Sequence, residues 1–144
     1  MQIRAWSAYI VDGKVYIPSR LKTEAGFFIE SEPVSIEKQS DLLALEKTLS
    51  AIIQRSIPTV PTPNFRAAPK PFLHKYAAKK SNKQFEGAAK YWSIEFDGNT
   101  ILLIPGIRRE NGGWLHDNER ALRIEVAGNF EEAIRRLTNE LCKS

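Results

Sequence analysis

The chain has little of what disulfide-bonded, redox or metal-dependent proteins require. It holds one cysteine, Cys142, and two histidines, His74 and His116, in 144 residues. A single cysteine cannot form an intrachain disulfide, and Cys142 has no cysteine or histidine neighbour at metal-ligand spacing. We therefore expect no disulfide, no bound metal and no cofactor.

Long apolar runs are also absent. The longest stretches, such as Ile101 to Ile104, fall far short of the ~20 residues that a membrane-spanning helix requires. The N-terminal residues enter a strand-like pattern by Ile3, without the apolar block of a signal peptide. We expect no contact with a membrane and a cytoplasmic location.

The two histidines come without the motifs of known catalytic sites. No nucleophile motif, phosphate-binding loop or metal-spaced ligand set accompanies either of them in the sequence. His116 lies near Asp117 and Glu119, but closeness in sequence alone does not define an acid and a base. We therefore expect a protein that is not an enzyme.

The chain does have enough apolar residues, 42%, for a folded core, and an uneven charge. The net charge of the whole chain is +4, but from Arg55 to Lys90 there are eight basic residues and one acid, Glu86. This segment therefore carries a net charge of +7, which leaves −3 for the rest. The positive charge is concentrated in the middle of the chain.

Two segments, about residues 1–55 and 88–144, match each other along their length. The clearest match sets Trp6-Ser7 against Trp92-Ser93 at a shift of 86 residues. Further matches follow in the same order: Asp12-Gly13 with Asp97-Gly98, Ile17-Pro18 with Ile104-Pro105, Gly26 with Gly112, Val34 with Leu122, and Asp41-Leu42 with Asn129-Phe130. The order predicts one unit written twice, with residues 56–87 as a connector.

Each copy is expected to form four strands followed by one helix. In the second copy Trp92, Ile94 and Phe96 alternate with polar residues, which indicates a strand with one buried face. Asp41 and Asn129 are predicted to cap the two helices. The sequence thus predicts an α+β fold of two tandem ββββα repeats, a pseudo-twofold module with antiparallel sheets and a helix per repeat. Trp6 and Trp92 are expected in its core.

The connector has two parts. Residues 58–63 are rich in proline and favour an extended, semi-rigid spacer. Residues 72–85 predict a helix, on which lysines three to four positions apart would form one basic stripe: Lys75, Lys79, Lys80 and Lys83. Such a stripe could contact phosphates.

Four blocks of the second copy carry a resemblance to a known repeat: Lys90-Tyr91-Trp92-x-Ile94-x-Phe96, Ile101 to Ile104 followed by Arg108-Arg109, Leu122-x-Ile124-x-Val126, and Phe130-x-x-Ala133-Ile134-x-x-Leu137. With the fainter first copy, this layout resembles the PUR repeat, the ββββα unit of purine-rich-element-binding proteins, whose structural relatives include the Whirly single-strand binders. The resemblance implies a non-enzymatic protein that binds single-stranded DNA or RNA on open sheet faces.

The candidate contacts for nucleic acid lie on the strand face opposite the tryptophans, at the strand ends and in the connector. Aromatic rings there could stack on bases and basic groups could bind phosphates. The candidates on the expected open faces are Tyr9, Lys14, Tyr16, Tyr91 and Arg123. Those after the second strand of each copy are Arg20, Lys22, Arg108 and Arg109, and those of the connector are Lys75, Lys79 and Lys80.

A protein-binding module, such as an immunity or inhibitor protein for a toxin or nuclease, is the alternative. The two repeats are slightly acidic, and an inhibitor of a basic enzyme would gather acids on one face. The acids concerned would be Glu30, Glu32, Glu95, Asp117 and Glu119. The partner would then be a protein, and a homodimer is a further alternative that the sequence leaves open.

Overall fold

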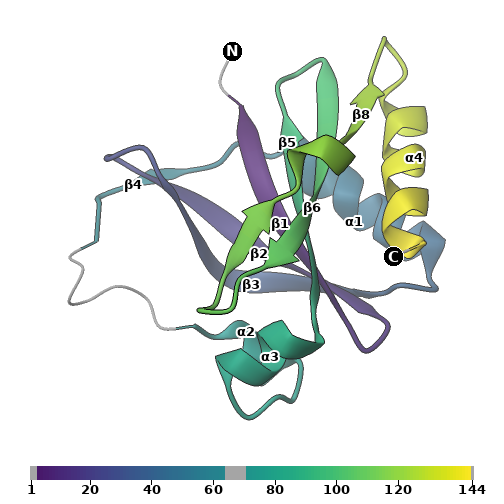
Figure 1. Cartoon of the computed structure of the whole chain (residues 1–144). Helices are drawn as coiled ribbons and strands as arrows, with labels where there is room; N and C mark the ends of the chain where they lie inside the picture. The colour runs from purple at the N-terminus through teal and green to yellow at the C-terminus, as the bar shows by residue number, and fades with distance from the viewer. Residues whose placement is uncertain (1–2, 64–70, 144) are drawn as a thin grey trace.

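A computed structural model describes residues 3–63 and 71–143 of the chain. The first part of it contains β1 (Arg4–Val11), β2 (Lys14–Thr23), β3 (Phe28–Lys38), α1 (Leu42–Gln54) and β4 (Thr59–Val60). The second contains α2 (Leu73–Tyr76), α3 (Asn82–Ala88), β5 (Lys90–Phe96), β6 (Thr100–Arg108), β7 (Trp114–His116), the 3₁₀ helix η2 (Asn118–Arg120), β8 (Leu122–Glu125) and α4 (Phe130–Cys142). Figure 1 shows their arrangement.

The described strands form one eight-stranded sheet in the order β3-β2-β1-β5-β6-β7, with β4 beside β2 and β8 beside β6. Every pairing is antiparallel except that of the two-residue β4 with β2. The α+β class and its antiparallel strands are therefore confirmed. The two halves do not keep separate sheets, because β1 pairs with β5 along its length, with Ser7 opposite Ser93.

The two halves differ in strand number. In the second half β7 and β8 are separate strands that both pair with β6. In the first half β3 is one strand of 11 residues that pairs with nearly all of β2, with a register shift between Pro18 and Ser19. The expectation of four strands in the first copy is thus wrong. At the register shift β3 skips only Glu32 and Pro33 and continues as one strand, whereas at the corresponding place the second half inserts η2 between β7 and β8.

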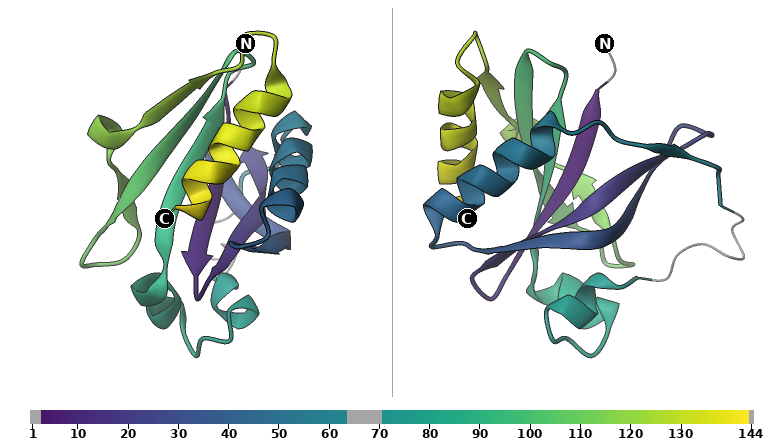
Figure 2. Two further views of the ribbon diagram at one scale, coloured as in Figure 1. Left: turned by 90° about the vertical axis from the view of Figure 1, so that its right-hand side faces the viewer. Right: turned by 180° about the vertical axis from the view of Figure 1, so that it is seen from behind.

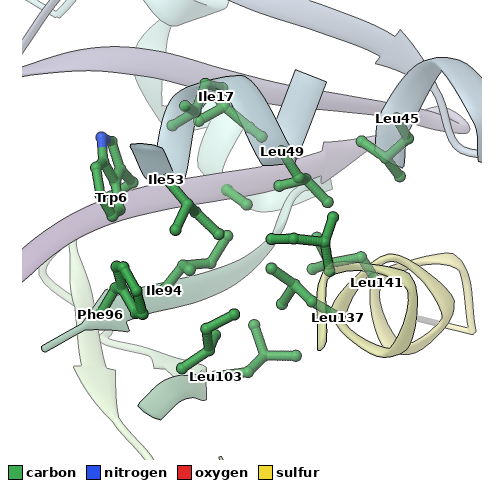
Figure 3. Close-up of a cluster of buried hydrophobic side chains, with 14 of the residues drawn as sticks. Trp6, Ile17, Leu45, Leu49, Ile53, Ile94, Phe96, Leu103, Leu137 and Leu141 are labelled. Atoms are coloured by element: carbon green, nitrogen blue, oxygen red, sulfur yellow. The ribbon is translucent and has the colours of Figure 1, made fainter. Parts of the chain in front are cut away.

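Helices α1 and α4 lie side by side on one face of the sheet (Figure 2). Both predicted caps are confirmed: the Asp41 side chain accepts a hydrogen bond from the Ala44 amide, and that of Asn129 from the Glu132 amide. Leucine and isoleucine side chains from both helices meet those of β1, β2, β5 and β6 in the main core (Figure 3). Trp6 is buried in this core, as expected, and Trp92 is half-buried and packs against the same core.

The connector covers one end of the opposite face. Leu73 of α2 and Phe85 of α3 pack in a second buried cluster with Tyr9, Val11 and Tyr16. The single helix expected over residues 72–85 is wrong, since Ala78 has a φ of 55° that no α-helix continues through. The chain instead forms two short helices, α2 and α3, at the bottom of Figure 1.

Neither a membrane-spanning helix nor a metal-ligand cluster occurs within residues 3–63 and 71–143: every helix there is too short or too polar to cross a bilayer, and no three His, Cys, Asp or Glu side chains converge. Cys142 is a free thiol. Its Sγ donates to the backbone oxygen of Gln39 at 2.9 Å, so it fastens the end of α4 to the link between β3 and α1.

Candidate functional site

The tyrosines that we expected on an open face lie under the connector. Tyr9 and Tyr16 are 7% and 3% exposed, and the Phe85 ring lies 5.4 Å and 6.2 Å from their ring centroids. Tyr91 is half-buried between Tyr9 and Trp114. The expectation of an open face is therefore wrong at this end of the sheet, and a nucleobase could not stack on Tyr9 or Tyr16 while α3 is in place.

The basic candidates lie on separate elements. Lys75 is exposed on α2, whereas Lys79 and Lys80 follow it in the loop before α3, so the expected lysine stripe does not form. Lys79 Nζ lies 2.9 Å from a carboxylate oxygen of Asp12. Lys14 is exposed at the turn between β1 and β2.

The arginine candidates are also dispersed. Arg108 ends β6 and Arg109 follows it, both exposed, at the hairpin that leads into β7. Arg123 lies on β8, where its Nε is 2.9 Å from Glu125 Oε1. Lys22 Nζ lies 6.0 Å from the centroid of the Phe28 ring on the neighbouring strand. These side chains are not gathered into one site.

Arg20 belongs to a polar cluster on the second face of the sheet. It lies directly opposite Glu30 in the register of β2 and β3. Its Nη2 donates to Ser7 Oγ, which lies 3.3 Å from the Tyr91 hydroxyl. The Tyr9 hydroxyl donates to Glu30 Oε1 at 2.9 Å. Side chains of four neighbouring strands, β3, β2, β1 and β5, thus meet here.

Two atoms of this cluster are buried without a hydrogen-bond partner in the described part of the chain: Glu30 Oε2 and Arg20 Nε. Burial raises the pKa of Glu30 above its ordinary value, against the opposing effects of the Arg20 charge and of the Tyr9 hydrogen bond. Burial also raises the pKa of Tyr9, which keeps its hydroxyl protonated as the donor. The Glu30 carboxylate is therefore held in a site where its charge is poorly solvated.

A pocket of about 410 Å³ opens beside Glu30, between β3, the connector helices and the start of β7. Aromatic rings form much of its lining, from Tyr9, Phe72, Phe85 and Trp114. Glu30 and Glu86 are its two carboxylates, and none of the lining residues that the structure describes is basic. The pocket is therefore apolar in its walls and acidic in its polar groups.

The Trp114 wall is held in place by the Tyr91 ring of β5, which reaches it across Gly106 of β6. The Trp114 and Tyr91 rings are stacked, with centroids 5.5 Å apart and planes 12° apart. Tyr91 in turn fits against Gly106, where a Cβ atom would lie 2.4 Å from its Cδ1. At the other side, Glu86 Oε1 accepts a hydrogen bond from the Gly113 amide at 3.0 Å, which ties α3 to the β6–β7 hairpin.

Sequence reasoning named Glu30 as an acid of the alternative function but missed Phe72, Phe85, Glu86 and Trp114 as lining residues. Their one local signal is the aromatic spacing of Phe72 and Phe85 in an otherwise basic connector. No sequence pattern shows that α3 folds back over β1.

No protein-family model matches the chain, and no curated protein matches it significantly in sequence. The solved structures that resemble its fold include two that match almost the whole chain. A protein of unknown function, NMB0488 from Neisseria meningitidis, matches with a TM-score of 0.67 at 11% identity, over 98% of this chain and 93% of its own. A chain of the CdiA-CT/CdiI toxin and immunity complex from Yersinia pseudotuberculosis matches with a TM-score of 0.65 at 12% identity, over 99% and 98%. At these identities the likeness shows a shared fold.

Proposed function

We propose that the chain is a non-enzymatic protein-binding module of the immunity type, which binds a toxin polypeptide and blocks it. The observation that carries the proposal is the likeness, over almost the full length of both chains, to a chain of the CdiA-CT/CdiI toxin and immunity complex. Neither of the two similar structures is described as a PUR or Whirly protein. The alternative that the acidic balance of the two halves suggested is therefore the better supported reading.

Two carboxylates expected for such a role project from the second face of the sheet. Glu30 contacts Tyr9 there, and strand alternation places Glu95 on the same side as Tyr91. Acids on this face would complement a basic toxin surface and speed association with it.

The β6–β7 hairpin offers apolar contact surface next to the pocket. Ile107 and Leu115 lie directly opposite each other across the two strands and are 51% and 55% exposed. Paired apolar side chains on a strand edge are candidates for the buried centre of an interface, because such centres supply most of the binding energy. Both side chains project from the strands on the side opposite to Trp114, because successive residues of a strand point to opposite faces. We infer that the toxin wraps around β7, at the edge of the sheet, and so covers both this pair and the neighbouring pocket.

The contacts described above give less support to binding of single-stranded nucleic acid. That role needs a continuous positive surface with accessible aromatic rings. Tyr9 and Tyr16 are buried, and Lys79 and Arg123 are paired with acids.

Co-expression tests the immunity role. The polypeptide encoded next to the gene of this chain would be produced in a bacterial host, alone and together with the chain. We expect the neighbour alone to arrest growth, and the chain to restore growth and to co-purify with it as a stable complex. Failure of the chain to restore growth or to bind would overturn the proposal. Salt-sensitive retention of single-stranded DNA or RNA in a mobility-shift test would favour the nucleic-acid role instead.

We also infer that the two halves are copies of one unit. Residues matched at the shift of 86 occupy equivalent places in the β1–β5 pair, since Ser7 lies opposite its own counterpart Ser93. Trp6 then lies opposite Ile94, and Trp92 opposite Ala8, which is the same relation seen from the other strand. This register supports a local twofold axis through the Ser7–Ser93 pair.

A further inference from the structure

The pocket beside Glu30 combines negative charge with aromatic walls. Its two carboxylates, Glu30 and Glu86, face a space lined by no basic residue of ranges 3–63 and 71–143. Its volume of about 410 Å³ lies within the ~300–1,000 Å³ typical of ligand sites. The charge of the lining therefore selects a cationic ligand.

Aromatic rings make the same selection. Tyr9, Phe72, Phe85 and Trp114 all line the pocket. The face of an aromatic ring attracts a cation through its quadrupole, and several rings around one space form the aromatic cage that recognises ammonium groups. Apolar walls also accommodate the methylene stem that carries such a group.

Glu30 has an unused acceptor at this place. Its Oε1 accepts the Tyr9 hydroxyl, but its Oε2 is buried without a hydrogen-bond partner in the described ranges. The Arg20 side chain, directly opposite in the strand register, donates to Ser7 instead. A cation that enters the pocket and reaches this buried oxygen would supply the hydrogen bond that it lacks and a second positive charge besides that of Arg20.

Glu86 has a different part. Both of its oxygens lie within hydrogen-bond distance of the Gly113 amide, at 3.0 Å and 3.4 Å. This bond fixes the second carboxylate at the pocket wall and connects α3 with the hairpin that carries Trp114. The pocket is thus formed before any ligand enters.

We propose that this pocket binds the cationic side chain of a lysine or arginine presented by the protein partner. The proposal rests on the proposed immunity function for the source of that side chain, whereas its chemistry rests on the pocket itself. The pocket would supply the specificity of the interface, and the neighbouring β6–β7 hairpin would supply its apolar contacts.

The first test uses the full chain and small probes, without the partner. The ¹⁵N-labelled protein would be titrated with the N-acetyl methylamides of lysine and arginine, and with those of norleucine and citrulline as uncharged controls. We expect saturable shifts of the Trp114 indole and Gly113 amide signals with a charged probe only. Equal shifts with charged and uncharged probes, or no shift with either cation, would overturn the proposal. The stronger of the two cations identifies the preferred side chain.

Matched variants assign the effect to the carboxylate. Glu30→Gln keeps the shape of the side chain and should weaken binding of the cation at least about tenfold. Glu131→Gln removes an exposed carboxylate from α4, outside the pocket, and should leave binding of the probes unchanged. Trp114→Ala offers a second test at a half-buried position, and should also weaken binding. Wild-type affinity in both Glu30→Gln and Trp114→Ala would overturn the proposal.

The partner complex gives an independent readout. If the toxin complex forms and Glu30→Gln leaves its affinity unchanged, the pocket proposal fails and the immunity function stands. If small cations bind but the chain neither restores growth nor co-purifies with the toxin, the immunity function fails and the pocket keeps its ligand chemistry. The two proposals can therefore fail separately.

Discussion

Arg20 and Glu30 lie directly opposite each other on β2 and β3, yet each hydrogen-bonds to a residue of β1 and they form no ion pair in the described structure. Arg20 reaches Ser7 and Glu30 accepts from Tyr9. The arrangement ties three strands together, at the cost of leaving one oxygen of Glu30 without a hydrogen-bond partner. The incompletely hydrogen-bonded Glu30 carboxylate therefore affects the free energy of unfolding in ways that can be measured.

Glu30 should make the stability of the chain fall as the pH rises. Its pKa is raised in the folded state, mainly by burial, so the folded chain holds this proton more tightly than the unfolded chain does. The free energy of unfolding should therefore decrease from pH 4.5, the ordinary value, up to the folded pKa. The Glu30→Gln side chain does not titrate, so the free energy of unfolding of the wild type should fall relative to that of the variant between these two pH values. Urea unfolding of both proteins from about pH 4 to about pH 8 measures the difference. A difference that stays constant or grows in favour of the wild type would contradict this assignment.

The Tyr9 hydroxyl should matter more than that of Tyr16. Tyr9→Phe removes the 2.9 Å hydrogen bond to Glu30 and leaves that carboxylate without any donor in the described structure, which we expect to cost about 1–3 kcal/mol. Tyr16→Phe is the matched control, because Tyr16 is as deeply buried but its hydroxyl makes no hydrogen bond to a described residue. Its loss should change the free energy of unfolding by less than about 0.5 kcal/mol. If urea unfolding shows equal losses of unfolding free energy in the two variants, the hydrogen bond from Tyr9 to Glu30 adds nothing to stability.

The main core could be predicted from the sequence because local signals determine it. The apolar stripe from Leu45 to Ile53 and the capping residues Asp41 and Asn129 are sufficient to place α1 and α4, and strand alternation is sufficient to place Trp6 under them. These patterns follow the periods of helix and strand, so they need no knowledge of distant contacts.

The second face could not be predicted in the same way. Its cluster joins Tyr9 to Phe85 and Glu30, which are 76 and 21 residues away in sequence. Strand parity correctly separates Tyr9 from the Trp6 face, but parity does not say whether a face is open or covered. The connector was predicted to be a spacer followed by a helix with a basic stripe, whereas Leu73 and Phe85 bury one side of it against the sheet.

The Tyr91 ring should be sensitive to a single methyl group at Gly106. Gly106→Ala would bring a Cβ atom to 2.4 Å from Tyr91 Cδ1, and we expect a destabilisation of about 1–3 kcal/mol. The same substitution in a Tyr91→Ala background should cost less, because the ring that it meets is gone. A double-mutant cycle by urea unfolding measures this coupling. Additive effects of the two substitutions would show that the Tyr91 ring and the backbone of β6 at Gly106 can move apart without cost.

The exposed apolar pair on the β6–β7 hairpin should be needed for the partner and dispensable for the fold. Ile107 and Leu115 are about half exposed and lie opposite each other, so Ile107→Ser with Leu115→Ser should change the free energy of unfolding by less than about 1 kcal/mol. If the toxin covers this hairpin, the same double variant should weaken the complex by about tenfold or more, since apolar contacts at the centre of an interface carry most of its energy. Leu43→Ser is the control, because Leu43 is 67% exposed on α1, an element separate from the hairpin. Calorimetric titration of the three proteins with the toxin gives the affinities. Loss of affinity in Leu43→Ser, with wild-type affinity in the hairpin variant, would place the interface on α1 instead.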